Sequence, residues 1–173
     1  VSGLPVSMSR DGVKTVFRNG RPVESVDETN RAVKKYVYGE KGELLAIEAY
    51  KDGILKTVEK IESGKISERI LPDGTIVSLN EKGQIDAISS AQSGELYRYV
   101  WSGNEVAEIQ VFDADRSLSR KVDVRNGRAV RVTLSDGIVY EIRDDRIDEI
   151  IYPDGSVEEM SYEEGERVLA GKM

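Results

Sequence analysis

The chain has 173 residues, 33% of them charged and 39% hydrophobic, and its formal net charge is −7. It contains no Cys and no His, which excludes disulfides, thiol and imidazole nucleophiles and the usual zinc sites. An acidic chain lacks the basic surface that a phosphate backbone requires, so we expect no nucleic acid partner. No apolar run approaches the roughly twenty residues of a membrane-spanning helix, and we expect no membrane insertion.

Glycines that follow a polar residue recur about every ten residues along the chain. Thirteen of the sixteen glycines belong to this series. They are Gly12, Gly20, Gly42, Gly53, Gly64, Gly74, Gly83, Gly94, Gly103, Gly127, Gly137, Gly155 and Gly165. Glycine accepts the positive φ of tight hairpin turns, and Asp or Asn before it tolerates the left-handed region. The intervening segments are rich in Val, Ile and Tyr, as strands are.

Three longer intervals between these glycines each contain a glycine-free turn signal. The signals are Asp27–Asn30, Asp113–Arg116 and Asp144–Arg146. Asp and Asn close turns with their own side chains, so these segments restore the ten-residue rhythm. Thr29–Tyr38 has the spacing closest to a helix, but its strand-like flanks favour a strand.

The fold expected from this pattern is all-β: a long antiparallel β-meander of repeated hairpins, in which strand plus turn occupy about ten residues. We expect a single β-repeat domain over residues 1–173. A sheet of about fifteen strands rarely stays open and flat, so it should curl, fold over or spiral.

The two ends of the chain carry opposite charge. Residues 1–36 hold seven Lys or Arg against four acids, and residues 141–173 hold four against eleven. This split favours head-to-tail contact between copies of the chain, or with another protein segment. The alternative is that these charges only solvate strand faces.

Three aromatic residues form the main candidate binding site. Tyr97, Tyr99 and Trp101 alternate along one segment, so their rings should share one face of a strand. Such a platform could bind a glycan or an apolar patch of a protein. The alternative is a stripe that braces the sheet.

No catalytic, cofactor or metal site is expected. Asp113 and Asp115 begin like a calcium loop, but Leu118 and Val124 stand where such a loop needs glycine and a bidentate acid. The glycines are dispersed, unlike those of a phosphate-binding loop. No pair of carboxylates is singled out for glycoside hydrolysis.

Several segments resemble YD repeats, which occur in the Rhs and teneurin families of surface and toxin-delivery proteins. Pro72–Val77 and Pro153–Val157 resemble the turn and strand of the unit, and Phe112–Leu118 and Tyr162–Arg167 resemble its aromatic-acid half. Together with weaker echoes at Tyr38–Leu44 and Leu79–Ile85, the resemblance covers residues 36–168. It implies antiparallel strands in a continuous spiral that encloses, spaces or presents something, and it implies no chemistry.

We therefore expect a non-enzymatic structural module that acts as a spacer or self-assembling subunit of a bacterial surface or secreted protein, and is thus extracellular. A glycan-binding or protein-binding module that uses the aromatic face is the alternative.

Overall fold

The computed structural model describes residues 6–163 and 166–172, and the side chains as far as residue 162. All the regular elements in this part of the chain are β-strands, and each pairing between described strands joins two neighbours in sequence in antiparallel fashion. The expected all-β meander of repeated hairpins is confirmed. Thr29–Tyr38 forms a turn followed by a strand. None of these residues belongs to a helix that could cross a membrane.

The chain divides into two compact units, Val1–Ile85 and Asp86–Met173. The strands of the first unit are β1 (Ser7–Arg10), β2 (Val13–Arg18), β3 (Arg21–Asp27), β4 (Ala32–Tyr38), β5 (Leu44–Lys51), β6 (Ile54–Glu62), β7 (Lys65–Ile70) and β8 (Ile76–Leu79). The strand at the boundary is β9 (Ile85–Ser89). The second unit continues with β10 (Leu96–Ser102), β11 (Glu105–Phe112), β12 (Leu118–Arg125), β13 (Arg128–Leu134), β14 (Val139–Arg143), β15 (Arg146–Ile151), β16 (Val157–Glu163) and β17 (Glu166–Lys172). Whether residues 1–173 fold cooperatively as the expected single domain is a separate question from this division, and the single domain stays a prediction.

Two kinds of turn connect the strands. Short turns such as Asn19–Gly20 and Asn126–Gly127 have positive φ at both residues, the type I′ geometry that matches strand twist. Longer turns share one pair of hydrogen bonds: Tyr152 N donates to Ser156 O and Gly155 N donates to Tyr152 O, both at 2.9 Å. Twelve of the thirteen glycines of the series have φ between 65° and 89°, and Gly165 lies outside the described residues.

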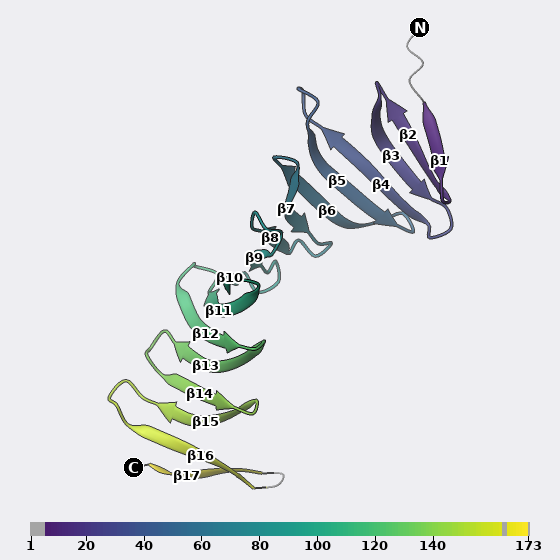
Figure 1. Ribbon diagram of the computed structural model, residues 1–173. Coiled ribbons are helices and arrows are strands. Elements are labelled where there is room, and N and C mark those ends of the chain that lie inside the picture. Colours follow the sequence, from purple (N-terminus) through teal and green to yellow (C-terminus); the bar gives the residue numbers. More distant parts are fainter. Residues whose placement is uncertain (1–5, 164–165, 173) are drawn as a thin grey trace. The chain divides into compact units, whose positions relative to one another are not determined.

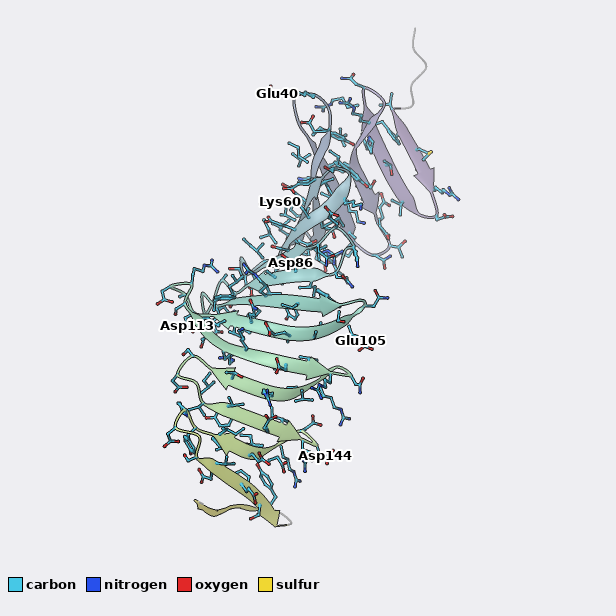
Figure 2. The ribbon with its side chains drawn as sticks, turned by 60° about the vertical axis from the view of Figure 1, so that its left-hand side comes forward. Glu40, Lys60, Asp86, Glu105, Asp113 and Asp144 are labelled. Atoms are coloured by element: carbon cyan, nitrogen blue, oxygen red, sulfur yellow. The ribbon has the colours of Figure 1, made fainter. Side chains whose placement is uncertain are left out.

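In the second unit the two kinds of turn lie at opposite ends of the strands. Figure 2 shows Asp113, in a longer turn, on the side where one set of strand ends lies, and Glu105 and Asp144, at short turns, on the other side. The register shifts by one residue beside the short turns, for example between Val100 and Trp101 and between Glu141 and Ile142. Such bulges increase the local twist of the strands.

Arg116 occupies a turn position that glycine holds elsewhere. Its φ is 70°, and the bonds Asp113 N to Ser117 O and Arg116 N to Asp113 O, both 2.9 Å, match those around Gly155. An L-residue in this region costs about 1–2 kcal/mol, partly offset by the entropy that glycine loses on folding. We expect Arg116→Gly to raise the free energy of unfolding by about 0.5–1 kcal/mol in urea denaturation. Arg116→Ala, which keeps the strain, is the control, and equal stability of both variants would contradict the explanation.

The strands of each unit lie in one layer (Figure 1), and little of the chain is buried. Among the described side chains only Val111, Ile150 and Met160 are buried, and all three belong to the second unit. The accessible surface is 12171 Å², whereas a compact protein of 19.2 kDa exposes about 8,400 Å². The sheets therefore expose both faces over much of their area.

Candidate functional site

The three candidate aromatic residues lie on β10, in the second unit. Tyr97, Tyr99 and Trp101 are half-buried, whereas Arg98 and Val100 between them are exposed. Across the sheet, Tyr97 is opposite Val111, Tyr99 is opposite Ile109 and Trp101 is opposite Val106. Paired residues of an antiparallel sheet share a face, so the rings belong to a larger surface. Their role in binding stays a prediction.

That surface crosses most of the second unit, and we call it the apolar face. One row of directly opposed residues runs from Tyr99 through Ile109, Val122, Val132 and Tyr140 to Ile150. The apolar face consists of Ile88, Tyr97, Tyr99, Trp101, Val106, Ile109, Val111, Val122, Val132, Leu134, Tyr140, Ile150 and Met160. All three buried side chains of the described residues belong to it. Two charged residues, Arg120 and Glu158, are directly opposite members of this face.

The opposite face of the same sheet carries charge. A second row of opposed residues, which we call the acidic row, consists of Glu108, Asp123, Arg131, Glu141, Glu149 and Glu159. Arg131 Nε donates to Glu141 Oε1 at 2.7 Å. Arg131 is also opposite Asp123, and the remaining pairs of the row join two carboxylates, as at Glu141 and Glu149. Directly opposed like charges destabilise a sheet.

The first unit arranges its charges differently. Lys60 is opposite Glu68, with Nζ and Oε2 2.7 Å apart, and Arg69 is opposite Glu59, with Nε and Oε1 2.9 Å apart. The two charges within each pair neutralise one another. The surplus negative charge of the chain lies in the second unit. Residues 1–85 hold fourteen Lys or Arg against thirteen acids, and residues 86–173 hold eleven against nineteen.

A cation in the middle of the acidic row should stabilise the second unit. Glu149 has a carboxylate on each side, Glu141 and Glu159, so Glu149→Lys turns two repulsive cross-strand pairs into attractive ones. We expect the free energy of unfolding to rise by about 1 kcal/mol at low salt, and by less at high salt, because exposed charges are screened. Glu149→Gln, which only removes the repulsion, should give about half of that gain. Thermal unfolding at two salt concentrations measures both variants, and loss of stability in both would contradict the assigned register.

Hydrogen bonds shift the pKa values of two titratable groups near the rings, Glu95 and Tyr97. Tyr97 donates its hydroxyl to Glu95 Oε2 at 2.7 Å. This bond, together with a hydrogen bond from Ser93, lowers the pKa of Glu95. The same bond to Glu95 raises the pKa of Tyr97. The pKa of Asp115 is likewise lowered, first by the backbone N–H of Ser117. These shifts move the groups away from neutral pH, whereas acid-base catalysis needs a pKa near it.

The turn that resembles part of a calcium loop is closed by its own side chains. Asp115 Oδ1 accepts hydrogen bonds from the Ser117 N–H at 2.9 Å and from the Ser117 hydroxyl at 2.7 Å. Within the described residues no group of three or more acids is placed to hold a metal ion. The carboxylate here therefore acts as a turn-closing group.

A repeated tyrosine arrangement was not anticipated from the sequence. Tyr38 donates its hydroxyl to Pro22 O at 2.9 Å and its ring lies 5.7 Å from the Arg21 guanidinium. Tyr162 donates to Ile147 O at 2.8 Å, and its ring lies 5.3 Å from Arg146. In both, the Arg and the acceptor begin a strand after a short turn, and the Tyr lies on the following strand. In the sequence, both cases show an Arg that precedes a Tyr by about sixteen residues. This recurring spacing could have indicated the arrangement.

Comparison with known proteins adds little to the description of the fold and the candidate site. No protein family model matches the chain, and no curated protein matches it. A solved structure, "Crystal Structure of TcdB2-TccC3-TEV", aligns with 97% of this chain and 10% of its own chain, at 15% identity and a TM-score of 0.31. The chain thus spans about a tenth of the length of that protein. A likeness at this TM-score adds nothing to the fold and site derived above.

Proposed function

We propose that this chain is a non-catalytic scaffold module of β-hairpin repeats, related to YD repeats, that serves as a spacer or self-assembling subunit of a bacterial surface or secreted protein. The observation that carries the proposal is the strictly sequential antiparallel pairing within each unit. In such an array each hairpin contacts only its neighbours, so length can change without altering the local structure. This suits a spacer better than a site that assembles distant residues.

Self-assembly would use the edge strands. Strand β1 pairs with β2 and strand β17 pairs with β16, and within the described residues neither strand pairs with a second neighbour. An edge strand with unpaired backbone groups can add a strand from another chain. The positive charge over residues 1–36 and the negative charge over residues 141–173 would orient copies head to tail.

Sedimentation velocity tests this association. We expect oligomers that grow with concentration at about 0.02 M salt and dissociate at about 0.5 M salt, because their guiding charges are exposed. Lys14→Glu with Arg18→Glu, both exposed, should weaken them. Lys56→Glu with Lys82→Glu, also exposed but outside residues 1–36, makes the same change in net charge and should have less effect. A monomer at high concentration and low salt would remove the self-assembling role.

A glycan-binding or protein-binding module remains the second candidate, because the three rings on β10 share a face that no other described element of the second unit covers. Binding should then be lost in Trp101→Ala while the sheet stays folded. A glycan array without hits, or Trp101→Ala that lowers stability and leaves binding unchanged, would assign the rings to bracing the sheet.

A further inference from the structure

We propose that the apolar face of the second unit is an interface with a second copy of this chain, in which two such faces pack together about a two-fold axis running along β14. This interface does not depend on the edge-to-edge association proposed above, since it uses a face of the sheet. Its occupant is inferred from the chemistry and extent of the face and from the positions of its two charged residues.

The two faces of the second unit differ strongly in composition. The apolar face is formed by aliphatic and aromatic side chains, whereas the other face carries the acidic row. An antiparallel sheet of this kind normally has one face in water and one packed against a core. Here the apolar face is packed only against its own neighbours, and most of its side chains, Tyr97 and Val132 among them, remain half-buried. The strand pattern is therefore that of half a β-sandwich.

The size of the face matches what a dimer requires. Strands lie about 4.8 Å apart and alternate residues about 6.8 Å apart, so eight strands and three rows cover about 780 Å². Accessible surface exceeds this flat area because side chains project from it. Stable interfaces bury about 800 Å² per partner, and the interfaces of homodimers are the more apolar ones.

The charged residues on the face are complementary under a two-fold operation. Arg120 lies on β12, opposite Val111 and Leu134, and Glu158 lies on β16, opposite Ile150. These strands are equidistant from β14 in the order of pairing. An axis along β14 places β12 of one copy over β16 of the other. Glu158 lies in the row of Val122, so Arg120 of one copy lies about 6.8 Å along the strand from Glu158 of the second copy, an offset that these two long side chains span. In an isologous interface each such contact is made in duplicate.

Cross-linking through introduced cysteines tests this geometry. The chain has no Cys of its own, so only the introduced residues can react. Chains with Arg120→Cys are mixed with chains carrying Glu158→Cys and treated with a bis-maleimide that spans about 12 Å, which combines about 10 Å between packed sheets with the offset of about 6.8 Å along the strands. We expect mixed cross-linked dimers at least ten times more abundant than with Lys121→Cys and Glu159→Cys, the next residues on the opposite face. Equal yields from the two pairs would overturn the proposal.

Sedimentation equilibrium gives an independent reading. The unmodified chain should form dimers with a Kd in the micromolar range that persist at about 0.5 M salt. Val132→Lys should weaken this dimer at least about thirtyfold, whereas Thr133→Lys, on the opposite face of the same strand, should not. Circular dichroism checks the β-structure of both variants, and if Val132→Lys unfolds, the cross-linking result decides.

The outcomes separate the two proposals. A monomer at about 100 µM overturns the face interface. Salt-sensitive oligomers larger than dimers that Val132→Lys leaves unchanged overturn it as well, and support edge association. Release of the dimer by an added oligosaccharide, with recovery of monomer, overturns the second copy as the occupant in favour of a sugar.

Discussion

Replacement of Ile150 by Asp should lower the free energy of unfolding of the second unit by about 3–5 kcal/mol, the cost of an unpaired charge at a buried position. Ile150 is only 8% exposed. Its neighbours across the sheet are Tyr140 and Glu158, so the new carboxylate gains no cation and adds repulsion. Urea denaturation followed by circular dichroism measures the change.

The matched control is the same substitution at the next residue. Ile151 lies on the opposite face, between Val139 and Val157, and is half-buried. Ile151→Asp should cost about 1–2 kcal/mol, mainly lost apolar burial. A larger loss at Ile151 than at Ile150 would mean that the two faces of the sheet are assigned the wrong way round.

Replacement of Gly94 by Ala should destabilise the second unit by about 2–3 kcal/mol, the sum of backbone strain and overpacking. The φ of Gly94 is 73°, and a Cβ added there would lie 2.9 Å from the Cβ of Ala114 in the next turn along the same edge. Gly155, at φ 84°, has no heavy atom within 4 Å of such a Cβ. Gly155→Ala should therefore show the backbone strain alone, about 1 kcal/mol.

A double substitution separates the two contributions. Ala114→Gly removes the neighbouring methyl group. Once the effect of Ala114→Gly alone is subtracted, the loss of stability in the double variant Gly94→Ala with Ala114→Gly should approach that of Gly155→Ala. Thermal unfolding of Gly94→Ala, Ala114→Gly, the double variant and Gly155→Ala, each against the unmodified chain, provides the comparison. If Gly94→Ala costs no more than Gly155→Ala, the two turns do not pack as described.

The meander could be predicted because its determinants are local. Positive φ at Gly12 or Gly155 depends on the residue itself, and alternation along Val130–Leu134 depends on neighbours in sequence. The glycine-free turns at Asp113–Arg116 and Asp144–Arg146 were also recognisable, because Asp tolerates turn geometry.

The acidic row could not be predicted, because it depends on register. Glu108 is opposite Asp123 only because a bulge between Val111 and Phe112 shifts the pairing of β11 with β12 by one residue. Bulges leave little trace in a single sequence. The shared face of Tyr97, Tyr99 and Trp101 followed from alternation, but its continuation to Ile150 required the pairing of six strands.

The division of the chain at Ile85 and Asp86 was not visible either. The turn rhythm runs through this point without a change, from Gly83 to Gly94. Both units use the same turn chemistry, and the difference between them lies in which residues face one another. In the first unit opposite charges do so, and in the second unit apolar residues gather on one face.

The central claim is that successive segments pair antiparallel in this register, so that chemically different residues occupy the two faces. Proton NMR of the chain tests it most directly through nuclear Overhauser contacts between opposed residues. The account predicts backbone contacts between Val122 and Val132 and between Val132 and Tyr140. Backbone contacts of Val132 with Lys121 or Glu141 as the directly opposed residues would shift the register by one residue, exchange the faces and contradict the account.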